Sequence, residues 1–234
     1  VYDTTANTAD LHLFESSVAK VRGTSKGTIA GQATIRSSEL GFVEFAPENG
    51  TLTLSATLVG SGNVKYSANG TGTAGTINVT GDNSGLLGKV ALSSTKVTVR
   101  FKNEAAIGGN PRKFAPDGLS LENGVTLWCT ADYQPNVTQP NRGVTLNGAV
   151  TVDVAANQTC SLGTPVAGAG SIVKKSAGTL ALGAANTFSG GITVNAGTLA
   201  LGNVEALAGG NVKLADGTTL RLDCAGIKVG GAIP

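Results

Sequence analysis

Acidic side chains are the residues of this chain that could support acid–base chemistry on a substrate. Four of them lie near two irregular stretches of the sequence: Asp117, Glu122, Asp132 and Asp153. Cleavage of a polysaccharide needs two carboxylates at one groove, one to donate a proton and one to accept it. These four are scattered, and most acids of the chain stand alone between small polar residues, as solvated outward positions do. The sequence therefore predicts no catalytic residues and a protein that is not an enzyme.

A serine nucleophile has one superficial candidate, Ser84 in the stretch Gly81-Asp82-Asn83-Ser84-Gly85. A serine hydroxyl needs a neighbouring base to become nucleophilic. The chain has one histidine, His12, which lies far away in an atypical N-terminal segment. The stretch also aligns with a second one at residues 183–188, so we interpret both as turns of a repeat.

The three cysteines, Cys129, Cys160 and Cys224, are all predicted to face inward. Cys129 and Cys224 follow leucines at a spacing of two, and Cys160 occupies the position of Leu52 in an earlier copy of a repeat. The odd number excludes complete pairing. Buried thiols are the favoured interpretation, and one disulfide between Cys129 and Cys160 is the alternative. No Cys-x-x-Cys pair, calcium-binding nonapeptide or phosphate loop occurs, so we predict no metal and no cofactor.

The composition limits the class of partner. The chain has 234 residues, a net charge of +2, 14% charged residues and 4% aromatic residues. Without a basic cluster or rings for base stacking, we expect no binding to nucleic acid. No apolar run reaches the ~18 residues of a membrane helix, so we predict no membrane-spanning segment. The start at Val1 lacks the features of a signal peptide, and we expect a mature form if the protein is exported.

Short alternating segments recur at a period of about 20 residues. Gly178-Thr179-Leu180-Ala181-Leu182 returns as Gly197-Thr198-Leu199-Ala200-Leu201, and related copies begin at Gly50, Gly75 and Gly217. Apolar residues alternate with small polar ones, so one face points inward and the other outward. Each unit can bury its apolar face only against the next copy, which predicts an all-β fold, a right-handed parallel β-helix (β-solenoid). Roughly ten coils would give a rod on the order of 50 Å long.

A longer duplication of roughly 100 residues organises these short copies. Asn83 matches Asn186, and both are predicted to be turn or internal ladder residues. Lys174 and Lys175 are predicted to be a solvated pair at a strand edge. Prolines mark two stretches as loops outside the solenoid, because proline cannot donate to a strand ladder. We divide the chain into an N-terminal cap or strand-donating segment (1–40), a first super-repeat (41–131) with a loop at 111–119, a loop insertion (132–142) and a second super-repeat (143–234).

Aromatic residues gather around the two predicted loops. The candidate contact residues are Phe114, Trp128 and Tyr133, whose rings would suit a glycan or protein partner if they are exposed. The simpler interpretation, which we favour, is that they cover the side of the solenoid.

Residues 168–202, with the sequence GAGSIVKKSAGTLALGAANTFSGGITVNAGTLALG, resemble the autotransporter-associated β-strand repeat, also called the passenger-associated transport repeat. Residues 60–110 resemble it in a degraded form, and residues 1–40 do not. The resemblance implies a β-helical, passenger-like protein at the bacterial cell surface. It specifies the fold and the secretion class rather than a ligand.

Two functions are open at this point. The first is a non-catalytic extracellular rod or stalk whose copies stack end to end into filaments, because an uncapped final coil at residues 226–234 would leave backbone groups and apolar surface unpaired. The alternative is an adhesin-type passenger segment whose side loops bind a cell-surface glycan or protein. The predicted partners are therefore copies of the chain itself, or a surface glycan or protein.

Overall fold

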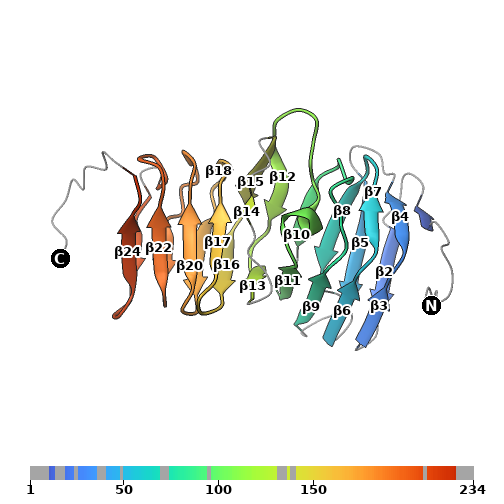
Figure 1. Cartoon of the computed structure of the whole chain (residues 1–234), viewed down its shortest axis with the longest axis horizontal. Helices are drawn as coiled ribbons and strands as arrows, with labels where there is room; N and C mark the ends of the chain where they lie inside the picture. The colour runs from blue at the N-terminus through green and yellow to red at the C-terminus, as the bar shows by residue number, and fades with distance from the viewer. Residues whose placement is uncertain are drawn as a thin grey trace.

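Successive coils of the chain place short strands on the same faces of a rod, and strands of neighbouring coils pair side by side (Figure 1). The computed structural model describes residues 11–13, 19–23, 26–35, 41–47, 50–68, 74–93, 96–130, 136–137, 141–207 and 210–224. Within these ranges every strand pairing is parallel. The predicted all-β solenoid is therefore confirmed.

Two sheets run along most of the rod. The long sheet has nine strands, which agrees roughly with the predicted number of coils: β3 (Lys26–Ile29), β6 (Gly50–Leu54), β9 (Gly75–Val79), β11 (Val97–Phe101), β13 (Thr126–Cys129), β16 (Ala149–Val154), β19 (Ser171–Lys175), β21 (Ile192–Val194) and β23 (Val212–Leu214). The second sheet has seven: β2 (Ala19–Gly23), β5 (Phe42–Pro47), β8 (Asn63–Ser67), β10 (Val90–Ser93), β12 (Ala115–Leu121), β15 (Arg142–Leu146) and β18 (Val166–Ala167).

The third face is divided between two shorter sheets. A three-stranded sheet contains β1 (Leu11–Leu13), β4 (Gln32–Ile35) and β7 (Thr57–Val59). A five-stranded sheet contains β14 (Asn136–Val137), β17 (Thr159–Leu162), β20 (Thr179–Leu182), β22 (Thr198–Leu201) and β24 (Thr219–Leu222). Between them in the chain lies one short helix, α1 (Glu104–Ile107), with Asn103 as its N-cap.

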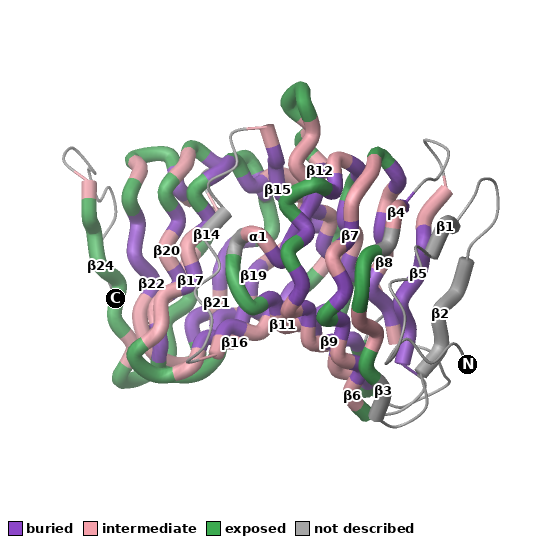
Figure 2. Tube along the Cα trace, turned by 45° about the vertical axis from the view of Figure 1, so that its right-hand side comes forward, coloured by how far each residue is buried: buried purple, intermediate pink, exposed green. Residues whose placement is uncertain are grey.

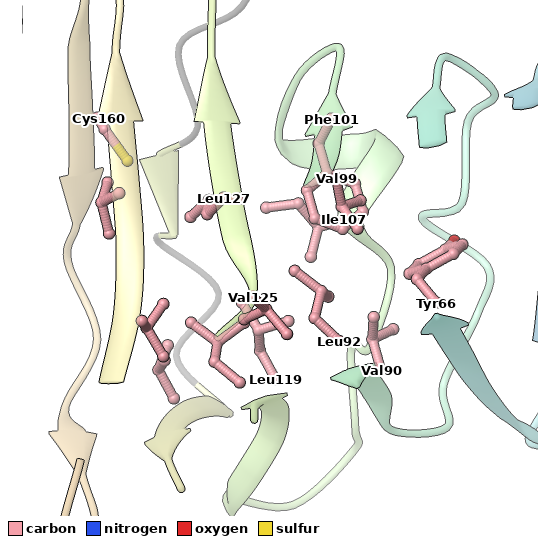
Figure 3. Close-up of a cluster of buried hydrophobic side chains, with 14 of the residues drawn as sticks. Tyr66, Val90, Leu92, Val99, Phe101, Ile107, Leu119, Val125, Leu127 and Cys160 are labelled. Carbon is pink, nitrogen blue, oxygen red and sulfur yellow. The ribbon is translucent and has the colours of Figure 1, made fainter. Parts of the chain in front are cut away.

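The core fills the interior of the rod because apolar residues occupy every second strand position. In β6, Leu52 and Leu54 are buried while Thr51 and Thr53 face outward and are half-buried. Parallel register repeats this pattern from coil to coil, so that inward side chains stack in columns. Figure 3 shows such side chains from several coils meeting in the interior. The core cluster therefore runs from Ile35 to Ala206, and Figure 2 shows these buried segments in purple, with β24 exposed beyond them.

Two buried asparagines connect coils at places where a sheet has no strand: Asn83 follows β7 on the third face, and Asn186 follows β18 on the face of the second sheet. The Asn83 side chain accepts a hydrogen bond from the Leu58 amide at 2.8 Å and donates one to the Ala106 carbonyl at 2.8 Å. Asn186 repeats this arrangement, with distances of 2.9 Å from the Val166 amide and 2.6 Å to the Ala206 carbonyl. The predicted internal ladder role is confirmed, because each side chain bonds the coil before it and the coil after it.

The segment 1–40 contains regular coil strands. Within it, β2, β3 and β4 pair in parallel with β5, β6 and β7. The proposed capping or strand-donating role of this segment stays a prediction.

The loop predicted at 111–119 is shorter than expected. Strand β12 begins at Ala115 and contains Pro116, so the irregular part ends at Phe114. The register of β12 against β15 shifts between Ala115 and Leu119, and such an irregularity accommodates a residue that has no amide hydrogen. Of the predicted insertion at 132–142, the structure describes β14 and residues 141–142.

Candidate binding surface

Trp128 lies on the outer face of the long sheet, in β13, and is half-buried. It lies in a strand rather than in either predicted loop, because Thr126 to Cys129 pair in register with Thr151 to Val154. Strand alternation turns Leu127 and Cys129 inward and leaves the indole outside. Trp128 therefore stands on the flat side of the rod.

Charged residues flank Trp128 on the neighbouring coils. Asp153 pairs directly with Trp128, and Lys175 pairs with Asp153. On the other side Arg100 places its guanidinium 5.9 Å from the centre of the indole ring. Its Nε also donates a hydrogen bond of 2.8 Å to the Thr130 hydroxyl. We call these four residues, Arg100, Trp128, Asp153 and Lys175, the central row.

A row of threonines runs beside the central row, two positions earlier on the same strands. Thr98 pairs with Thr126, and Thr126 pairs with Thr151. All three are half-buried, as expected for the outer face of a sheet. The surface around Trp128 therefore combines one aromatic ring with charged groups on one line and hydroxyl groups on the next.

Phe114 is an exposed contact candidate on the segment between α1 and β12, with 53% of its surface accessible. This segment rises above the ends of the neighbouring strands (Figure 1), and Arg112 and Lys113 within it are also exposed. Asn141 Nδ2 donates to the Arg112 carbonyl at 3.3 Å. The tip of the segment is thus basic and aromatic and is attached to the chain before β15. The third predicted contact residue, Tyr133, lies outside the described residues.

Arg142 anchors the base of this segment from inside the rod. Its side chain is fully buried, and its Nη1 donates to the Gly108 carbonyl and, at 3.1 Å, to Asn110 Oδ1. Burial lowers the pKa of Arg142 to about 10. Gly118 makes room for it, because a Cβ at that position would lie 3.0 Å from Arg142 Cγ. No sequence pattern indicated this contact, since Arg142 lies at the edge of a predicted loop.

Cys129 and Cys160 are buried as predicted, and both are free thiols. Cys129 pairs with Val154, and a turn leads from Val154 to Cys160 in the same coil. Burial, and then a hydrogen bond with Cys160, raise the pKa of the Cys129 thiol well above its usual range. Cys224 directly follows the residue after β24 in the last described coil and is half-buried, and its predicted inward position stays a prediction.

Lys174 is fully buried, so the prediction of a solvated pair with Lys175 is wrong for this residue. It occupies the inward column between Val152 and Val194. Its Nζ donates to the carbonyls of Lys175, Ser176 and Ala196 at 2.8, 2.7 and 3.1 Å. Burial is the main cause that lowers the pKa of Lys174. The ammonium group thus binds the turn between the long and five-stranded sheets.

Of the described carboxylates considered for catalysis, Asp117 lies in β12, Glu122 directly follows β12 and Asp153 lies in β16, and the first two have structural partners. Asp117 accepts from Lys89 Nζ at 2.6 Å. Glu122 accepts from Asn147 Nδ2 at 2.7 Å and from the Ser120 hydroxyl at 3.1 Å. Asp153 belongs to the central row, and Asp132 lies outside the described residues. Among the described residues, no three His, Cys, Asp or Glu side chains are grouped as metal ligands would be, and no helix could cross a bilayer.

A match to a known family lies within the second half of the rod. Residues 172–201 match the family described as the passenger-associated transport repeat. The match covers 30 of the 234 residues. In the structure this repeat comprises most of β19 and all of β20, β21 and β22, together with the Asn186 rung.

A similar protein extends the comparison beyond the repeat. The chain is 35% identical over 156 residues to a protein named adhesin BmaC autotransporter from Brucella suis biovar 1 (strain 1330). The alignment covers 63% of this chain and 4% of that protein, so the chain spans a small part of the relative's length. No solved structure matches the chain.

Proposed function

We propose that the chain is a non-catalytic segment of an extracellular, passenger-like protein that extends from the bacterial cell surface as a rod. The observation that supports this most is the continuous stack of parallel coils around a passenger-associated transport repeat. Such a stack forms an elongated rod, because each coil contacts only the coils before and after it along one axis. The likeness to a protein named as an autotransporter and an adhesin supports the same setting.

Surface location is testable on intact cells that carry the natural gene. Antibodies raised against the purified chain should label intact cells, and protease added outside should remove the label. Labelling that requires permeabilised cells would contradict the proposal. An antibody against a cytoplasmic protein serves as the control for cell integrity.

End-to-end stacking is the finer part of this proposal. The last described coil exposes Leu214, Leu220 and Leu222, with 46%, 37% and 42% of their surfaces accessible. Leu222 pairs with the buried Leu201, so it continues a core column that a further coil would cover. The occupant we propose is the first coil of a second copy, whose strands have the same direction. This contact is heterologous, and repetition of it produces an open filament.

Sedimentation at increasing concentration tests this contact. We expect the chain to associate, and Leu220→Glu to keep it monomeric because a charge would be buried at the junction. Val204→Glu is the matched control, since Val204 is 58% exposed but lies in a turn rather than in β24. A monomer at all concentrations, or association of Leu220→Glu, would exclude stacking through this end.

Adhesion through the side loops is the second candidate function. It is favoured by the exposed Phe114 on a projecting basic segment, and aromatic and arginine side chains often dominate binding surfaces. Phe114→Ser together with Arg112→Ser should then abolish adhesion to host cells. The circular dichroism spectrum should not change, because both side chains are exposed. Adhesion that survives both substitutions would exclude this segment as the contact.

A further inference from the structure

The outer face of the long sheet changes character in the middle of the rod. Towards the N-terminus, the outward column that contains Arg100 holds Thr28, Thr53 and Asn78. On the next four coils it holds the central row, which consists of three charged residues and the one tryptophan of the chain. In a repeat protein the core must be similar in each coil, whereas an outward position is free to differ, so this change gives the middle of the rod a surface chemistry of its own.

We propose that the central row is a binding platform for an acidic polysaccharide. This assignment deepens the adhesive function and rests on that function for its biological setting. A sugar ring stacks on a flat aromatic face through its C–H groups, and Trp128 presents its indole on the flat side of the rod. The guanidinium of Arg100 lies 5.9 Å from the centre of the indole ring, so an acidic sugar stacked beside it would also meet a positive charge.

The polar groups around the ring suit a chain of hydroxylated units. Rungs of the sheet repeat at ~4.8 Å, so the four residues of the row extend over about 15 Å along the rod axis. Asp153 supplies an acceptor and Lys175 a donor on the two coils that follow Trp128. Thr126 and Thr151 supply hydroxyl groups on the parallel row. A saccharide lying along the axis would meet a polar partner on each coil.

The balance of charge favours an acidic ligand over a neutral one. Arg100, Lys175 and the exposed Lys102, which follows β11, carry three positive charges at this part of the sheet. Asp153 carries the one negative charge of the row. A polymer with repeated carboxylates would be attracted to this surface, and the attraction would weaken as salt is added.

Tryptophan fluorescence of the full chain tests the proposal, because Trp128 is the sole tryptophan and reports on this site alone. The probe is oligogalacturonate, a linear polymer of uronic acid, and dextran is the neutral comparison. We expect a saturable change in emission with oligogalacturonate and none with dextran. Lys175→Glu should weaken the binding about tenfold. Lys213→Glu, which introduces the same charge on an exposed position of β23, should leave it unchanged.

Three results would contradict the proposed binding site. They are no saturable change in tryptophan emission with oligogalacturonate, an equal change with dextran, or equal effects of Lys175→Glu and Lys213→Glu on binding. Calorimetry on Trp128→Leu removes the dependence on fluorescence, and oligogalacturonate binding that survives this substitution would also exclude the site. None of these measurements depends on surface labelling or on cell adhesion, so the platform and the passenger function can fail separately.

Discussion

Single side chains replace whole strands at two places in this rod. Asn83 and Asn186 each join two coils through one donated and one accepted hydrogen bond, and both are almost completely buried. A carboxamide is suited to this task because it carries a donor and an acceptor at one end. The recurrence of asparagine was visible in the sequence, and the geometry explains why the residue recurs.

Removal of one such rung should be costly. Asn186→Ala leaves the Val166 amide and the Ala206 carbonyl without their partner, and we expect a loss of about 2–4 kcal/mol in the free energy of unfolding. Urea unfolding followed by circular dichroism measures it. Asn195→Ala, at an exposed position, is the control and should change stability by less than about 0.5 kcal/mol. Equal effects of the two variants would show that the rung does not contribute.

Oxidation of the buried thiols is a second prediction for single residues. During refolding with oxidised glutathione as the acceptor of two electrons and two protons, Cys129 and Cys160 should form a disulfide, since both side chains belong to the same buried cluster. Thiol titration of the unfolded protein should then find Cys224 as the sole free cysteine. The cross-link closes a segment of about 30 residues and should stabilise the fold by about 3 kcal/mol. Three titratable thiols after oxidation would contradict the pairing.

Lys174 shows a limit of inference from sequence at this scale. We predicted a solvated position for it because of its charge, although it lies two positions after the buried Ile172 in the same strand. The buried ammonium group is satisfied by hydrogen bonds to three carbonyl groups, two from the turn that follows and one from the next coil. Those acceptors depend on how coils are aligned, which the sequence of one strand does not contain.

Neighbouring coils approach each other closely at several turns that contain glycine. Gly197 has a φ of 77°, and a Cβ there would lie 2.3 Å from the Gly178 carbonyl oxygen of the preceding coil. Gly217 has a φ of 76°, and a Cβ there would meet nothing within 4 Å. The two positions therefore have the same backbone conformation and different surroundings.

Alanine substitution at these glycines should separate backbone strain from overlap between coils. Gly217→Ala should cost about 1 kcal/mol from the left-handed conformation alone. Gly197→Ala should cost more, about 3 kcal/mol or above, because the neighbouring coil must move. Thermal unfolding of both variants measures the difference. Similar losses would mean that the coils do not pack at this distance.

The repeat pattern was sufficient to predict the strands, but it did not predict which side chains lie together on the outer surface. Alternation predicted the strands and their inward faces, since burial requires it in every coil. It did not place Trp128, because a residue next to a predicted loop can belong to either the loop or the strand. Pro116 was assigned to a loop for a sound reason, and the register shift in β12 is the feature that admits it to a strand.

At the scale of the whole molecule, stability is distributed along the rod axis, because each coil is stabilised by the coils next to it. Each coil is covered by its neighbours, whereas the last described coil is exposed. Leu182 and Leu222 occupy the same column, one buried and one 42% exposed. Leu182→Ala should therefore cost about 2–5 kcal/mol, and Leu222→Ala less than about 1 kcal/mol.

Amide hydrogen exchange provides the measurement at this scale. Protection should be greatest in the middle coils and should decrease towards β24. In Leu182→Ala the loss of protection should extend to both adjacent coils, since they share the cavity. Uniform protection along the rod would contradict nearest-neighbour stability.

The register that joins Thr179 to Thr198 and Leu182 to Leu201 has a consequence for inheritance. Two adjacent coils with nearly the same sequence are interchangeable partners for the strands on either side. Unequal recombination within the gene would insert or excise one complete turn, and the flanking sheets would meet again without a mismatch. Rod length can therefore drift between lineages while the cross-section is preserved.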